Sequence, residues 1–262
     1  MNIHDFEQTM LAYTLILPRL FACFIVLPIL GKQVLGGTLV RNGVACSLAL
    51  FIYPCVADTL PSGIEGLELA VLIGKEILIG VLVGFVVSIP FWAIEATGFI
   101  IDNQRGASMA STLNPLLASQ TSPTGVLLTQ TLITLFFSGG AFLAMLGALF
   151  TSYANWPIAT FYPHVGSQWA GFFLGQFTHM LALCLVFAAP LLVAMFLAEF
   201  GLALVSRFAP SLNVFILSMP IKSLVSSLIL VPYLYLLMNM AHDSVLLALD
   251  PVRLLGPVLE QP

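Results

Sequence analysis

The residues whose types and spacing could support catalysis are few, and none completes a catalytic set. Two Gly-Lys dipeptides, at residues 31–32 and 74–75, lack the upstream glycine and the following Ser or Thr of a phosphate-binding loop. The four histidines have no metal-ligand spacing to one another or to cysteine. The run His-Asp-Ser at 242–244 suggests a triad, but adjacent residues on a helix do not face each other. We therefore expect no enzyme activity, an intramembrane protease included, and no cofactor or metal site.

A second set of chemically active side chains consists of charged residues inside or at the edges of apolar segments. They are Arg19, Lys75, Glu76, Glu95, Asp102, Arg105, Glu199, Arg207 and Lys222. In contact with lipid, each would cost a few kcal/mol. Asp102 and Arg105, at i and i+3, are the pair that we expect first. The set forms either internal ion pairs that fix helix packing, or the lining of a water-filled passage or subunit interface.

The stretch from Gly98 to Gly125 interrupts the apolar pattern. On a helix, Gly98, Asp102 and Arg105 form one stripe, with Glu95 one turn earlier. After Gly106 the residues are small, hydroxyl-bearing or amide-bearing, without charge or helical periodicity, which predicts a loop of about twenty residues. Loops of this length inside compact structures are usually functional or disordered.

Two interpretations of this loop remain open. It is either a simple exposed connector or a movable seal in a passage through a membrane-embedded assembly. A connector in bulk water would more often carry Lys or Glu, whereas this loop is uncharged and contains Met109, Leu113, Leu116 and Leu117. We therefore favour the seal.

Composition places all of these residues in a membrane protein. The chain has 262 residues, of which 60% are hydrophobic and only 8% are charged, whereas a soluble domain carries about 25% charged residues. The net charge is −4 and no basic cluster is present, so nucleic-acid binding has no electrostatic basis. The 20 glycines and 16 prolines indicate closely packed and broken helices.

The elements that must position the charged residues are about six apolar helical segments. We expect them at residues 11–30, 38–56, 67–101, 126–150, 169–200 and 223–247. As one helix, the third would be about 52 Å long, longer than a hydrocarbon core of about 30 Å. Either Pro90 splits it, or the helix continues out of the lipid.

Proline and glycine predict several breaks and contacts. We expect the fifth segment to be interrupted at Pro190 and to end near Glu199. The apolar residues 212–219 lie between two prolines and are too few to span a bilayer, which predicts a re-entrant or packed break. Two GxxxG pairs, at 80/84 and 171/175, predict faces for close helix packing, either within the chain or with another subunit.

Two ordered motifs resemble those of a known family. The stretch GFIIDNQRGASMASTLNP, residues 98–115, resembles the "G-x-x-I-D-x-Q-x-G-x-S-M…P" signature of the type III secretion export gate. The stretch at 188–222 is similar to the same family's second signature, "P…G-L…R-x-A-P-x-L-N-V-F…P-L-K". Its matching positions are Pro190, Gly201, Arg207, Pro210, Asn213, Phe215, Pro220 and Lys222. The chain is identified as a member of the T subunit family (SctT, YscT or SpaR type), with FliR as the flagellar counterpart, and LNVFILSMP favours the virulence type.

The resemblance implies an all-α integral membrane subunit, one domain over 1–262, packed in a helical export-gate assembly. Its partners would be R-type and S-type gate subunits, a U-type switch subunit and unfolded secreted polypeptides. It would lie in the bacterial inner membrane as a multi-pass protein, largely at the periplasmic side. The alternative function is a self-contained secondary transporter or channel for a small solute, with the broken helix at 210–220 as its substrate site.

The resemblance also assigns the residues of a pore plug. The loop 106–124 would act as the pore plug, with Gly106, Ser108, Met109, Leu113, Pro115 and Pro123 as its members. Structural or interface roles fall to Glu95, Asp102, Gln104, Arg105, Glu199, Arg207, Asn213 and Lys222.

Overall fold

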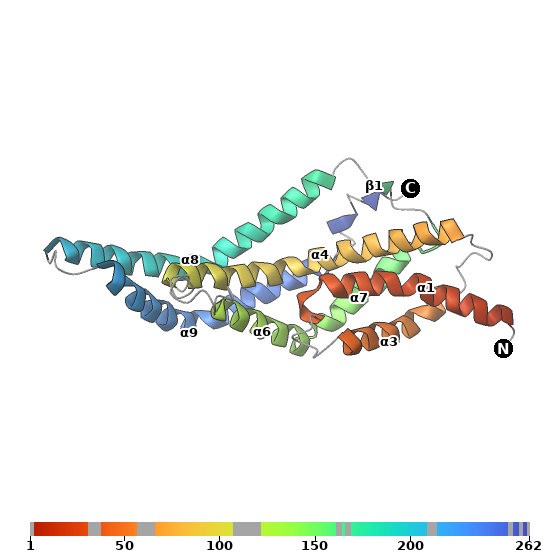
Figure 1. Ribbon diagram of the computed structural model, residues 1–262, viewed down its shortest axis with the longest axis horizontal. Coiled ribbons are helices and arrows are strands. Elements are labelled where there is room, and N and C mark those ends of the chain that lie inside the picture. The colour runs from red at the N-terminus through yellow and green to blue at the C-terminus, as the bar shows by residue number, and fades with distance from the viewer. Residues whose placement is uncertain are drawn as a thin grey trace, which may run out of the picture. The chain divides into compact units, whose positions relative to one another are not determined.

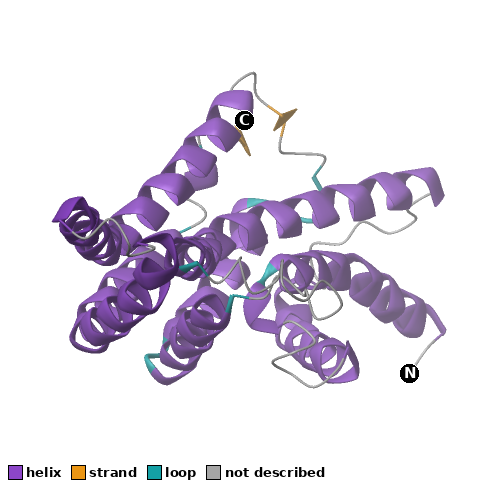
Figure 2. Ribbon diagram, turned by 60° about the vertical axis from the view of Figure 1, so that its left-hand side comes forward, coloured by secondary structure: helices purple, strands orange, loops and turns teal. Residues whose placement is uncertain are grey.

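The computed structural model describes residues 3–30, 38–56, 66–106, 122–160, 164–165, 169–208, 214–250, 254–256 and 259–260. Its elements are α1 (Ile3–Val26), η1 (Pro28–Leu30), α3 (Thr38–Val56), α4 (Gly66–Arg105), α6 (Pro123–Ser138), α7 (Ala141–Asn155), β1 (His164–Val165), α8 (Trp169–Phe208), α9 (Val214–Ala248) and β2 (Leu259–Glu260) (Figure 1). The two strands have two residues each and pair antiparallel, and the rest of the regular structure is helical (Figure 2). The predicted all-α fold is confirmed.

By length and composition, four helices of the described chain could cross a membrane. They are Thr9–Val26 of α1, all of α4, all of α8, and Ile216–Ala248 of α9; α6 and α7 together would make a fifth span. Every apolar segment predicted from the sequence contains a helix. The apolar part of α3, Thr38–Pro54, is shorter than the four candidate spans, so α3 is not counted among them. The chain is a multi-pass membrane protein.

Proline breaks far fewer helices than the sequence predicts. Pro90 lies within α4, a continuous helix of 40 residues that is about 60 Å long. Likewise, α8 passes through Pro190 and ends at Phe208, so the predicted interruption and the predicted end near Glu199 are wrong. Proline removes one helical hydrogen bond and costs about 3 kcal/mol. In apolar helices, side-chain packing and local adjustment of the backbone compensate for this loss.

The helix break predicted at residues 212–219 is wrong for residues 214–219, which the structure describes. Helix α9 begins at Val214 and continues through Pro220 and Pro232 without interruption. Residues 209–213, which include Pro210 and Asn213, lie outside the described residues.

The fourth predicted segment is instead two helices. Helix α6 ends at Ser138 and α7 begins at Ala141, with Gly139 and Gly140 between them. Gly140 has φ +75°, a left-handed conformation that glycine adopts without steric cost. The Gly139 N–H donates to the Leu135 carbonyl at 2.7 Å and so ends α6.

The helices form two compact units. Unit 1 comprises Met1–Ile89, Gly140–Gln176 and Leu246–Pro262, and unit 2 comprises Pro90–Gly139 and Phe177–Val245. In unit 1, α1 packs along α3 beside α7 and the first part of α4 (Figure 1). In unit 2, a buried cluster of Ile101, Leu191 and Met195 joins α4 to α8, with side chains of α9 packed against it. The expectation of a single domain stays a prediction.

The GxxxG pair at Gly80 and Gly84 packs against another helix of the same chain, which was one of the two predicted alternatives. A Cβ at Gly80 would lie 2.3 Å from the Arg19 carbonyl oxygen, and one at Gly84 would lie 2.8 Å from that of Cys23. Helices α4 and α1 of unit 1 are therefore in backbone contact. A Cβ at Gly171 or Gly175 would meet no described atom within 4 Å.

This difference predicts opposite outcomes for two matched substitutions. Gly80→Ala is expected to destabilise the protein by about 2–3 kcal/mol, because the backbones of α1 and α4 must separate. Gly175→Ala is expected to be neutral or to stabilise by about 0.5 kcal/mol, because alanine is the better helix former. The difference in stability would be measured from the thermal unfolding midpoints of the two variants in the same detergent. Equal midpoints would contradict the assignment of α1 as the partner of Gly80.

Candidate functional site

The candidate site is a cluster of four polar residues where the predicted loop begins and ends, in unit 2. Asp102, in the last turn of α4, is 3% exposed. Its Oδ2 accepts from the Ser122 hydroxyl at 2.5 Å and from the Thr124 N–H at 3.0 Å. Its Oδ1 accepts from the Thr124 hydroxyl at 2.7 Å and pairs with Arg105, which also donates to the Thr124 hydroxyl at 2.6 Å. We call Asp102, Arg105, Ser122 and Thr124 the Asp102 cluster.

Local sequence explains why the cluster forms. Ser122 is the N-cap of α6, its hydroxyl accepts from the Gly125 N–H at 2.9 Å, and Pro123 occupies the first helical position. The carboxylate of Asp102 then satisfies another free N–H at this helix start, where negative charge is favourable. Arg105, in the last turn of α4, is favourable at a helix C-terminus for the same electrostatic reason.

Beside the cluster, the backbones of α4 and α6 touch. A Cβ at Gly98 would lie 2.2 Å from the Gly125 Cα, and one at Gly125 would lie 2.9 Å from the Glu95 carbonyl oxygen. The predicted stripe of Gly98, Asp102 and Arg105 therefore faces α6, and the predicted ion pair of Asp102 and Arg105 is confirmed. Ser122 and Thr124, the other partners of Asp102, were not predicted from the sequence. The Ser-Pro start of a helix is the signal that could have found them.

The described residues also set the limits of the loop. Gly106, at φ +90°, ends α4, and its N–H donates to the Asn103 carbonyl at 3.0 Å. A Cβ at Gly106 would lie 3.2 Å from Cγ of Met219 in α9. Because α6 begins at Pro123, the predicted plug members Gly106 and Pro123 lie at its two edges. The others, Ser108, Met109, Leu113 and Pro115, lie outside the described residues.

Two residues of the predicted structural or interface set also form an ion pair in unit 2. The Lys222 ammonium of α9 donates to Glu199 Oε2 of α8 at 3.1 Å, with the Glu199 side chain 45% exposed. Gln104 is half-buried, whereas Glu95 and Arg207 are exposed. Neither Glu95 nor Arg207 has an ion pair among the described residues, and Asn213 lies outside them.

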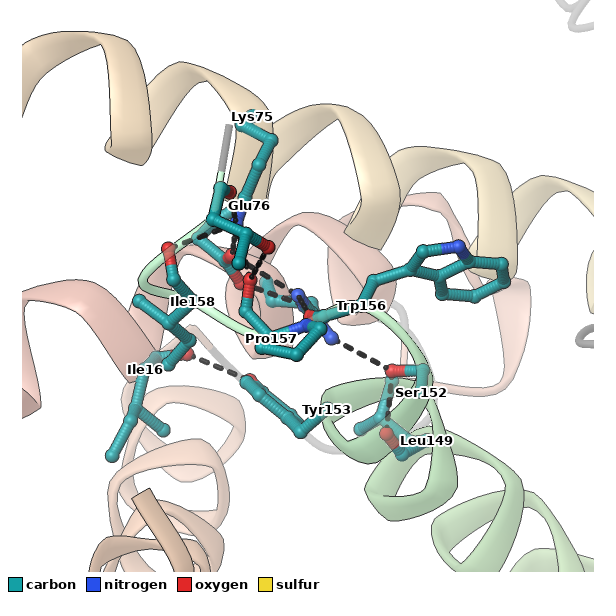
Figure 3. A network of polar contacts seen from close by, with 11 residues as sticks. Ile16, Lys75, Glu76, Leu149, Ser152, Tyr153, Trp156, Pro157 and Ile158 are labelled. Atoms are coloured by element: carbon teal, nitrogen blue, oxygen red, sulfur yellow. Dashed lines mark hydrogen bonds and ion pairs between the residues drawn. The ribbon is translucent and has the colours of Figure 1, made fainter. Parts of the chain in front are cut away.

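Unit 1 contains a second network of polar contacts (Figure 3). Arg19 and Glu76 are both 0% exposed and form a bidentate pair, with Nε to Oε2 at 2.7 Å and Nη2 to Oε1 at 3.0 Å. Arg19 also donates to the Ser152 hydroxyl at 3.1 Å and to the Trp156 carbonyl at 2.8 Å. Its guanidinium lies 4.1 Å from the centre of the Tyr153 ring.

Lys75 extends this network to the connector after α7. Its ammonium donates to the carbonyls of Pro157, Ile158 and Thr160 at 2.8, 3.0 and 2.9 Å, and pairs with Glu76 at 3.0 Å. The Lys75 ammonium is half-buried, and these four acceptors satisfy its N–H groups. For Arg19, Lys75 and Glu76, internal ion pairing is therefore the correct interpretation, and it joins α1, α4 and α7.

These features define the class of protein. It is a multi-pass helical membrane protein in which the buried charged side chains of the described residues are paired within the chain. Among the residues that the structure describes, no group of His, Cys, Asp and Glu could hold a metal ion.

Residues 10–247 match the family model of bacterial export proteins, family 1, and the chain belongs to this family. It is similar to Yop proteins translocation protein T of Yersinia pestis, with 62% identity over 97% of this chain and 98% of the relative. It is 33% identical to secretion system apparatus protein SsaT of Salmonella typhimurium, over 87% and 89% of the two chains. It is 25% identical to flagellar biosynthetic protein FliR of Bacillus subtilis, over 92% and 93%. The predicted family is confirmed, and it is a family of export components, not of enzymes.

Proposed function

We propose that the chain is the T-type subunit of a type III secretion export gate in the bacterial inner membrane. With R-type and S-type subunits it forms the pore through which unfolded secreted proteins enter, next to a U-type switch subunit. The family supports this role, as do relatives named for Yop protein translocation and for a secretion apparatus. Identity of 62% to the Yersinia protein, against 25% to a flagellar one, favours a virulence system.

We further propose that residues 106–124 act as the plug of this pore. The Asp102 cluster is the observation that carries the proposal, because it holds both ends of the loop at one point. A segment anchored in this way can move in its middle while its attachments stay intact. Met109 and Leu113 supply apolar side chains that seal against ions without strong fixed contacts. The small residues around them let the seal give way to an extended polypeptide.

The remaining predicted residues hold the subunit in register. The pair of Lys222 and Glu199 joins α8 to α9. Arg207, in the last turn of α8, and Asn213, six residues further along the sequence, contact neighbouring subunits. The alternative of a self-contained transporter depended on a broken helix at 210–220. Because α9 is continuous from Val214 through Pro220, no observation favours that alternative.

Deleting residues 109–119 tests the plug. We expect the deletion to raise ion leak through assembled gates, because it removes the sealing side chains and leaves the Asp102 cluster intact. The matched control replaces the same residues with a Gly-Ser segment of equal length. It should leak as well if the side chains make the seal, and should stay tight if length alone matters. Co-purification of the neighbouring subunits confirms assembly. An assembled deletion variant with unchanged leak would refute the plug role.

A further inference from the structure

One face of α9 is exposed along most of the helix and has the spacing of a helix-packing seam. Its residues are Leu224, Leu228, Val231, Tyr235 and Asn239, all in unit 2. Leu224, Leu228, Val231 and Tyr235 are 66–77% exposed. The separations of four, three, four and four residues keep these side chains on one side of the helix. We call this face the α9 seam.

Polar side chains follow the C-terminal part of the seam at intervals of about one helical turn. Tyr235, Asn239 and Asp243 lie at i, i+4 and i+8, with Asp243 at the edge of the seam, and all three are exposed. Within the described part of the chain, none of the three has a side-chain hydrogen bond or ion pair. All three lie in the candidate span Ile216–Ala248. The buried ions Arg19, Glu76 and Asp102, in contrast, have full sets of partners.

Neither lipid nor water alone suits this face. Hydrocarbon would leave the Asn239 amide and the Asp243 carboxylate without hydrogen-bond partners. Water would leave the leucines and the valine exposed. A second helix satisfies both needs. Its apolar side chains would cover the N-terminal part of the seam, and its polar groups would form hydrogen bonds with the C-terminal part. A single asparagine in an apolar seam is a known way to set the register of two packed helices.

We propose that the α9 seam binds one apolar helix of a different membrane protein, which places a Lys or Arg beside Asp243 and a hydrogen-bonding side chain opposite Asn239. The charge pattern argues against a second copy of this chain. A parallel copy would place Asp243 next to Asp243, and α9 carries no Lys or Arg after Lys222, which is itself paired with Glu199. The inference rests on the proposed role in a multi-subunit gate and adds the docking face and the chemistry of its partner.

Photocrosslinking in bacteria that contain the complete export apparatus tests the seam. The crosslinking residue p-benzoylphenylalanine replaces Tyr235, or replaces Leu236 as the control. Leu236 is also exposed, at 54%, but points about 100° away around the helix. We expect protein adducts at least about five-fold stronger at Tyr235. The crosslinked peptide should come from an apolar helix of another membrane protein and contain Lys or Arg. A peptide from a second copy, a peptide without a basic residue, or no protein adduct would overturn the proposal.

A charge exchange tests the ion pair itself. Asp243→Lys is expected to lower co-purification of the crosslinked partner at least about ten-fold, and replacing the partner's basic residue with Asp should restore it. Glu68→Lys is the control, since Glu68 is exposed at the start of α4 in unit 1. Equal co-purification for Asp243→Lys and Glu68→Lys, or no restoration, would overturn the proposal. If the loop deletion leaks while these results are negative, the export role stands and the docking face is wrong.

Discussion

Replacing Glu76 with alanine is expected to lower the free energy of unfolding by about 3–5 kcal/mol, because the change leaves a buried charge without a partner. Arg19 is 0% exposed and has no other carboxylate within ion-pair distance among the described residues. Its bonds to the Ser152 hydroxyl and the Trp156 carbonyl satisfy N–H groups but do not balance its charge. Lys75 loses its pairing with Glu76 at the same time. Two positive charges then lie close together where α1, α4 and α7 meet.

Thermal unfolding in detergent, followed by tryptophan fluorescence, measures this effect. The double variant Arg19→Met/Glu76→Leu should recover most of the loss, because apolar residues of similar volume commonly replace buried ion pairs with little change in stability. Glu199→Gln is the control. It removes a pair whose carboxylate is 45% exposed, and the cost should stay below about 1 kcal/mol. If Glu76→Ala and Glu199→Gln lowered the free energy of unfolding equally, the network of Arg19 and Glu76 would not be a main source of stability in unit 1.

Replacing Asp102 with alanine is expected to cost about 3 kcal/mol and to release the start of α6. The carboxylate accepts three hydrogen bonds from Ser122 and Thr124 in addition to its pairing with Arg105. Hydrogen bonds to a charged group contribute about 1.5–3 kcal/mol each, but bonds that share one acceptor are not additive. The Thr124 N–H at the helix start would be left buried without an acceptor.

Hydrogen exchange of the backbone amides near the helix start measures this release directly. In Asp102→Ala, the Thr124 amide should lose protection, and ion leak through the assembled gate should rise because the loop loses one of its anchors. Thr124→Val is the matched control. It keeps the backbone N–H bond to Asp102 and removes only the hydroxyl, so protection should largely persist at a cost of about 1 kcal/mol. Unchanged protection in Asp102→Ala would show that the cluster does not anchor the loop.

The sequence determined the properties that depend on composition and on short spacings. Low charge and high apolar content predicted a membrane protein of helices, and two motifs predicted the family. The i, i+3 spacing predicted the ion pair of Asp102 and Arg105, and the stripe with Gly98 predicted a common face. These features repeat within one or two helical turns, so local geometry alone specifies them.

Only the tertiary structure decided which residues far apart in the sequence contact one another. Arg19 and Glu76 are 57 residues apart, and Arg19 and Ser152 are 133 apart, so no local pattern pairs them. The two GxxxG pairs look alike in sequence, yet α1 covers the one at 80/84 and no described atom covers the one at 171/175. Pro90 and Pro190 have strong local breaking signals, but both lie inside 40-residue helices. In each case the outcome depends on packing summed over whole helices, which exceeds the local preference of any single residue.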